Sequence, residues 1–123
     1  MFKVYTRKLG DSYVLCLQGQ LVTGAIATLQ KIVFGQIDAI SLVLDFARVS
    51  RIDAAGLGLL LELREYSLSK NIDFKLMNVS GLVRRVFEIS QLDSVFEILP
   101  DRAETFRSVG QRPHTALKLA TCN

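Results

Sequence analysis

An apolar strand followed by an amphipathic helix constrains the fold of this chain more than any other feature. Residues 40–46 (ISLVLDF) are almost continuously apolar, which is typical of a central strand. Residues 54–69 place leucines along one side of a helix, and residues 72–77 then alternate apolar and polar side chains as a further strand does. A strand, helix and strand in this order need a crossover connection. The segment therefore predicts a sheet that is largely parallel.

The rest of the chain adds a hairpin and more helices to this unit. The expected elements are a short strand at 4–6, a longer one at 13–17, a helix capped by Thr23 and ending near Gly35, a helix after Ser80, a short strand at 95–99 and a helix at 101–110. We predict a single α/β domain, a mixed sheet of about five strands with about four helices, over residues 1–110. Residues 111–123 are expected to form a C-terminal tail, which could be disordered.

Composition and charge favour one folded domain and argue against several partner classes. The chain has 123 residues, half of them hydrophobic, with 15 basic and 12 acidic side chains. The basic excess lies in residues 1–10 and 111–123, so no nucleic-acid partner is predicted. The cysteines, Cys16 and Cys122, form no metal or redox motif, and no signal peptide or membrane span is evident. We therefore expect a cytoplasmic protein with no direct membrane insertion.

The start of the helix at 54–69 carries the most informative motif, Asp53-Ala54-Ala55-Gly56-Leu57-Gly58. A helix that begins directly after a strand has unpaired N–H groups, and Asp53 is placed to accept from them as an N-cap. The two glycines would let another backbone approach closely. Such N–H groups also attract phosphate, but no P-loop lysine follows and Asp53 already brings negative charge. Helix capping by Asp53 and close packing at the glycines are sufficient to explain this motif, so the motif alone does not indicate a function.

Beyond this motif, the chain resembles the STAS domains of the anti-sigma-factor antagonist family. The similarity lies in LVLDFARVSRIDAAGLGLLLELREY, in SGLVRRVFEISQLDSVFEILPD and in GQLVTGAIATLQ, and it covers roughly residues 4–110. In that family the motif is D-S-[ST]-G-x-G, and a partner anti-sigma kinase phosphorylates the serine after the aspartate. When that serine is bare, the antagonist binds the anti-sigma factor and releases sigma.

This chain departs from the family at the residue that is phosphorylated. The phosphoacceptor position is Ala54 and its neighbour is Ala55, so neither has a hydroxyl to receive a phosphoryl group. The family's acidic G-E-x-D start of the first helix is replaced by Gly19-Gln20-Leu21-Val22. The resemblance therefore implies a binding module without phosphorylation at the usual site. Two alternatives stay open, that Ala54 was introduced to block phosphorylation and that Ser50 is a substitute phosphoacceptor.

The predicted function is that of a regulatory protein that binds a histidine-kinase-like anti-sigma factor, releases sigma and so regulates transcription. The predicted partner-binding residues are Val22, Thr23, Ser50, Asp53, Ala54, Ala55, Gly56, Leu57 and Gly58. No enzymatic activity, cofactor or metal is predicted; His114 lies in the tail, and Asp45 is expected to bond backbone. A homodimer is left open. The alternative function is that of the STAS subunit of a bacterial lipid-transport ABC complex, which binds and regulates the transporter ATPase. This chain also resembles such a subunit at ARVSRID and in the leucine-rich helix that follows.

Overall fold

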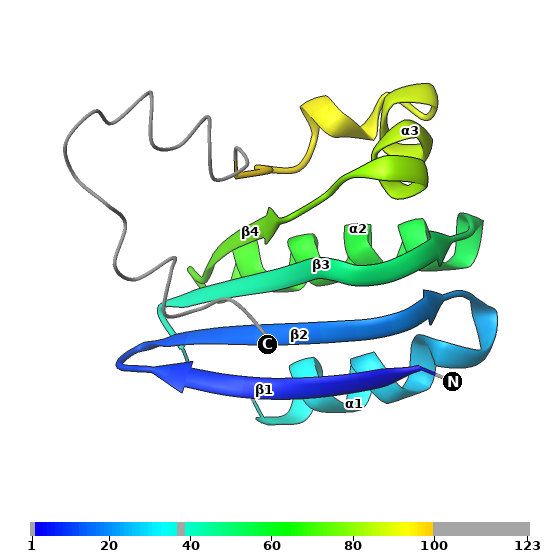
Figure 1. Cartoon of the computed structure of the whole chain (residues 1–123). Helices are drawn as coiled ribbons and strands as arrows, with labels where there is room; N and C mark the ends of the chain where they lie inside the picture. Colours follow the sequence, from blue (N-terminus) through cyan, green and yellow to red (C-terminus); the bar gives the residue numbers. More distant parts are fainter. Residues whose placement is uncertain (1, 37–38, 100–123) are drawn as a thin grey trace, which may run out of the picture.

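The computed structural model of the chain describes residues 2–36 and 39–99 (Figure 1). The elements in order are β1 (Lys3–Leu9), β2 (Ser12–Leu21), a 3-10 turn η1 (Thr23–Ala25), α1 (Ile26–Gln36), β3 (Ser41–Ile52), α2 (Ala54–Ser69), β4 (Asp73–Met77), α3 (Gly81–Ile89) and a 3-10 turn η2 (Leu92–Ser94). The strands form one sheet in the order β1-β2-β3-β4. The first pair is antiparallel and the other two are parallel, which confirms the mixed α/β sheet.

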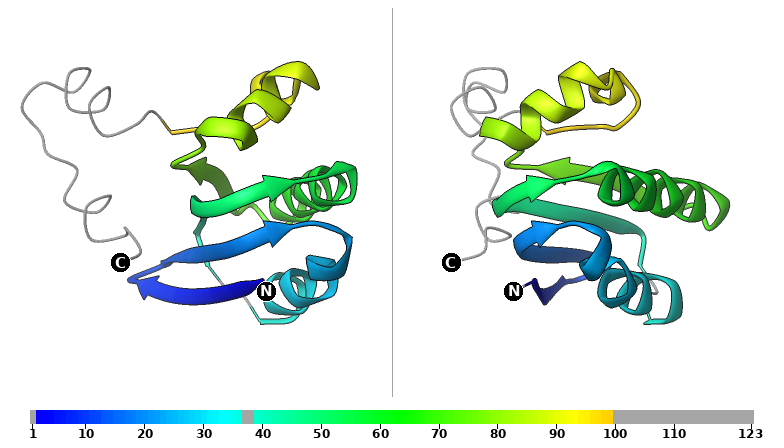
Figure 2. Two further views of the ribbon diagram at one scale, coloured as in Figure 1. Left: turned by 45° about the vertical axis from the view of Figure 1, so that its right-hand side comes forward. Right: turned by 90° about the vertical axis from the view of Figure 1, so that its right-hand side faces the viewer.

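The helices α1 and α2 lie side by side against one face of this sheet (Figure 2). Helix α3 crosses the upper end of the sheet and packs against β3. Between them lies the main core, which includes the fully buried side chains of Leu15, Leu44, Leu60, Leu63 and Phe87. A smaller buried cluster of Val14, Cys16 and Met77 lies apart from the main core. It lies on the opposite face of the sheet, because residues of adjacent sequence number in a strand point to opposite faces.

Aromatic rings fix α3 on the sheet. Phe87 is edge-on to Phe46 of β3 at 6.2 Å between ring centroids and stacks on Phe96 at 5.7 Å. Phe96 in turn lies 6.4 Å from Phe74 of β4. This chain of contacts holds α3 at the end of the sheet where β3 finishes, because one side of the helix is committed to the core.

Three strands are longer than the sequence pattern predicts. The strand expected at 4–6 spans Lys3–Leu9. The strand expected at 40–46 continues to Ile52, and the strand expected at 13–17 continues through Gly19 to Leu21. Their parallel pairing extends to Leu21 and Ile52, with register shifts on the way. The sequence pattern predicts a loop near the end of β3 because the side chains there are polar and exposed. The backbone nevertheless stays paired with β2 in this segment. Ser50 consequently lies within β3.

Two predicted caps behave differently from expectation. Thr23 does not cap α1; Val22 precedes η1 without any side-chain cap, and the Thr23 side chain turns to Asp53 instead. Ser80 holds the N-cap position of α3, but its side chain makes no cap hydrogen bond.

The strand expected at 95–99 is reduced to one parallel bridge between Leu76 and Ile98. Two predictions lie outside the described residues: the helix at 101–110 and the tail at 111–123, which contains His114 and Cys122.

Candidate functional site

Asp53 joins the start of α2 to the turn that leads into α1. Its Oδ1 accepts a hydrogen bond from the Gly56 N–H at 2.9 Å, as predicted for an N-cap. Its Oδ2 accepts from the Thr23 N–H at 3.3 Å and from the Thr23 hydroxyl at 3.4 Å. The Asp53 N–H donates to the carbonyl of Leu21 at 3.4 Å. One residue therefore brings Thr23 and the first turn of α2 together.

These hydrogen bonds lower the pKa of Asp53 below its usual value of 3.8. The largest cause is the Gly56 N–H, which stabilises the charged carboxylate. Partial loss of hydration acts in the opposite direction, and the two groups of Thr23 add to the lowering. The carboxylate is thus ionised at neutral pH, and its charge is directed at backbone N–H groups of the chain itself.

The two glycines of the motif have different roles. A Cβ on Gly56 would collide with the carbonyl oxygen of Leu21 and would lie 2.8 Å from Cγ1 of Ile52. The close backbone approach predicted for Gly56 is therefore confirmed. A Cβ on Gly58 would meet nothing within 4 Å, and this glycine is exposed. The prediction of close approach is wrong for Gly58, because it points away from the ends of β2 and β3.

Ala54 occupies the exposed first position of α2. Ala55 and Leu57 beside it are half-buried, and Val22 is half-buried on the neighbouring turn. The site predicted from sequence thus presents methyl and aliphatic groups around a capped helix start. An aliphatic carbon has no lone pair for attack on a phosphate, so residue 54 cannot take up a phosphoryl group.

Ser50 and Asp45 do not join this hydrogen-bond network. The hydroxyl of Ser50 is exposed and donates to the carbonyl of Gly19 at 3.4 Å. Asp45 is buried, and its Oδ1 accepts from the Ala47 N–H and from Nδ2 of Asn78, both at 2.9 Å. The expectation that Asp45 bonds backbone is confirmed. Among residues 2–36 and 39–99, no group of three metal-ligating side chains is found.

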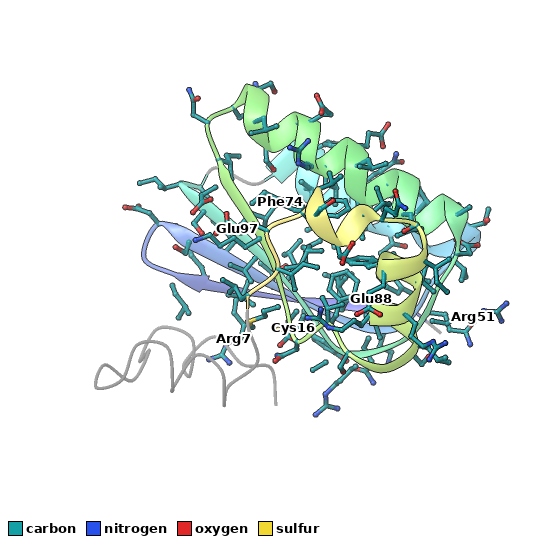
Figure 3. The ribbon with its side chains drawn as sticks, turned by 90° about the horizontal axis from the view of Figure 1, so that it is seen from above. Arg7, Cys16, Arg51, Phe74, Glu88 and Glu97 are labelled. Carbon is teal, nitrogen blue, oxygen red and sulfur yellow. The ribbon has the colours of Figure 1, made fainter. Side chains whose placement is uncertain are left out.

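Sequence reasoning missed several residues that the fold brings to the same end of the molecule. Arg51 projects from the end of β3, just before Asp53 (Figure 3). Leu82 and Ile89 of α3 are 70% and 78% exposed, although the sequence pattern indicated only the core-facing stripe of that helix. Their spacing of seven residues, two helical turns, was the available signal. The helices of the described part include none that is long and apolar enough to cross a membrane.

Comparisons with known proteins agree on the family and the fold. A family model for the STAS domain matches residues 3–111. An anti-sigma factor antagonist from Mycobacterium paratuberculosis has a similar structure, with a TM-score of 0.74, 18% identity, and coverage of 90% of this chain and 96% of the other. A putative anti-sigma factor antagonist from Thermotoga maritima has a TM-score of 0.72 and 20% identity, and the match covers 88% of this chain and 95% of the other. A sulfate transporter family protein from Wolinella succinogenes has a TM-score of 0.64 and 18% identity, and the match covers 71% of this chain and 72% of the other. No curated protein sequence matches significantly.

Replacing the two glycines by alanine should have opposite effects on stability. We expect Gly56→Ala to lower the free energy of unfolding by about 1–3 kcal/mol, because the new methyl overlaps the Leu21 carbonyl. Gly58→Ala should raise it by about 0.5–1 kcal/mol, because the methyl enters open space and alanine favours the helix. Urea denaturation of both variants measures the difference. Equal effects would contradict the packing role given to Gly56.

The lowered pKa of Asp53 predicts a loss of stability in acid. A carboxylate whose pKa is lower in the folded state stabilises that state above its unfolded pKa, and the contribution disappears as the pH falls through the folded pKa. We therefore expect the wild type to weaken more than Asp53→Asn between about pH 6 and pH 3. Urea midpoints across this range provide the measurement. Parallel curves for the two proteins would show that Asp53 does not contribute in this way.

Proposed function

Because this chain belongs to the STAS domain family, we propose that it is a regulatory, protein-binding module that acts like an anti-sigma factor antagonist. Its partner is an anti-sigma factor related to histidine kinases, and binding releases sigma and so regulates transcription. The binding domain comprises residues 1–110, with 111–123 as a tail, and the protein acts in the cytoplasm. Support comes from the matched family and from the similar structures of an anti-sigma factor antagonist and of a putative one.

The observation that carries the proposal is the exposed methyl group of Ala54 at the capped start of α2. Asp53 and Gly56 supply the cap and the close packing, while no hydroxyl is present at residues 54 and 55. The helix start is therefore shaped for contact and lacks the group that a kinase would modify. The module binds its partner constantly, and control comes from the amounts of the two proteins.

The proposed contact surface has an apolar centre and few charges. Its residues are Val22, Thr23, Ser50, Asp53, Ala54, Ala55, Gly56, Leu57 and Gly58. Asp53 supports this surface from within, because both of its carboxylate oxygens accept hydrogen bonds from the chain. Gly56 is buried and likewise acts by positioning the helix start, whereas Ala54 and Leu57 offer aliphatic surface to a partner. Ser50 lies at the margin.

The proposal assigns no enzymatic activity, cofactor or metal to the chain. Both carboxylate oxygens of Asp53 accept hydrogen bonds from the chain itself, so this side chain serves as a structural cap in the proposal. The lipid-transport ABC ATPase is the competing partner. Titration calorimetry with a purified kinase-like anti-sigma factor and with a purified STAS-binding ABC ATPase from the source organism separates the two. Binding to the ATPase alone would replace the proposed function.

A charge at residue 54 should weaken the complex without harming the fold. We expect Ala54→Glu to raise the dissociation constant for the anti-sigma factor at least about tenfold, because a carboxylate would be buried without a partner. Glutamate is favourable in the first turn of a helix, so stability should be preserved. Leu68→Glu, at a 57% exposed position in the last turn of the same helix, is the matched control. Equal affinities for both variants would place the interface elsewhere.

The missing hydroxyl predicts a specific outcome with an anti-sigma kinase. Incubation of the wild type with the kinase and labelled ATP should leave residues 50–58 without label, whereas Ala54→Ser should become labelled at residue 54. Mass spectrometry locates the phosphate in each case. A phosphate on Ser50 of the wild type would contradict constant binding, because the alternative phosphoacceptor would then be in use.

A further inference from the structure

Helix α3 carries an exposed apolar stripe, Leu82, Val86 and Ile89, which we call the α3 stripe. Leu82 and Ile89 are 70% and 78% exposed, the highest values among the large exposed hydrophobic side chains of the described residues. Val86 between them is half-buried. The core-facing side of the helix is Val83 and Phe87, so the α3 stripe lies beside that contact and not within it. Exposed aliphatic groups in a row on one helix flank indicate a contact surface.

The α3 stripe faces the end of the molecule where α2 begins. With 3.6 residues per turn, Arg84 and Glu88 lie on one flank of α3. Leu82, Val86 and Ile89 lie on the other flank. Figure 3 shows Glu88 on the side of α3 toward the middle of the sheet and Arg51 beyond the other side. The flank opposite Glu88 is therefore directed toward Arg51, which is two residues before Asp53. The stripe thus lies toward the same end of the molecule as the surface proposed around Ala54.

Two exposed arginines lie at this end of the molecule, Arg51 at the end of β3 and Arg85 on α3. Arg51 and Arg85 are both exposed, and neither forms an ion pair or a hydrogen bond with another residue in the described ranges. By contrast, Lys75 pairs with Asp73 at 3.1 Å and with Glu97 at 3.6 Å. The nearby carboxylate of Asp53 is occupied by Gly56 and Thr23. The guanidinium groups are thus available to carboxylates from another molecule.

We propose that the α3 stripe binds an amphipathic, acidic segment of the partner protein, with the segment's apolar side on Leu82, Val86 and Ile89 and its carboxylates on Arg51 and Arg85. This inference rests on the proposed function and extends its contact surface. An acidic segment is favoured because an uncharged or basic one would leave the arginines desolvated and unpaired. A second copy of this chain fits less well, because a two-fold contact would bring the same arginines together.

A peptide titration tests the surface without any anti-sigma factor. The probes are a synthetic amphipathic helical peptide with a leucine side flanked by glutamates, and the same peptide with lysines in place of the glutamates. We expect the acidic peptide to shift the NMR amide signals of Arg51, Leu82, Arg85 and Ile89 of the full chain and to bind at least about tenfold more tightly than the basic one. Absence of these shifts, or equal binding by both peptides, would overturn the proposal. So would dimerisation through this face in sedimentation experiments.

Variants with matched controls test the same surface in the full complex. Ile89→Glu and Arg51→Glu should each weaken binding of the purified kinase-like anti-sigma factor about tenfold. Ile40→Glu, at a 63% exposed position before β3, and Lys8→Glu, next to the β1–β2 turn, should leave it unchanged. If the anti-sigma factor binds all four variants like wild type, the α3 stripe is excluded and the proposed function stands. If the acidic peptide binds but no anti-sigma factor does, the stripe stands and the proposed function fails.

Discussion

The junction at Asp53 is the interaction on which the geometry of the candidate site depends. Its two carboxylate oxygens accept from Gly56 on one side and from Thr23 on the other, so the start of α2 and the turn before α1 are held together. Gly56 permits this arrangement, because any side chain there would collide with the Leu21 carbonyl at the end of β2. Without that approach, the first turn of α2 could not lie against the ends of β2 and β3.

This junction also determines what the helix start can do. An ionised carboxylate already occupies the N–H groups that would otherwise attract an anion, which makes the position a poor phosphate site. Ala54 is held outward on a rigid first turn and offers only a methyl group. In the proposed function, recognition at this helix start depends on shape and apolar contact, and the proposed contact of the α3 stripe adds charge from Arg51 and from α3.

Much of the fold could be predicted because periodicity reports which side of an element is buried. The helices at 54–69 and after Ser80 and the strand at 72–77 match α2, α3 and β4 closely. The ends of β2 and β3 could not be predicted in the same way. Arg48 and Ser50 are exposed although their backbone is in β3, whose pairing with β2 continues to Ile52, so their polar side chains say nothing about the hydrogen bonds of the main chain. The role of Thr23 was likewise misjudged, because its partner Asp53 is thirty residues away.

The chemistry available at residue 54 follows from the amino-acid sequence alone, because a methyl group has no nucleophilic oxygen in any fold. The N-cap role of Asp53 also follows from local sequence, since it depends on the N–H group only three residues later. The neighbours of Ala54 are a different matter. Arg51 and the α3 stripe share one end of the molecule because Phe87 packs between Phe46 and Phe96 and so orients α3. Such contacts join residues that are far apart in the chain, and a pattern of local spacing carries no information about them.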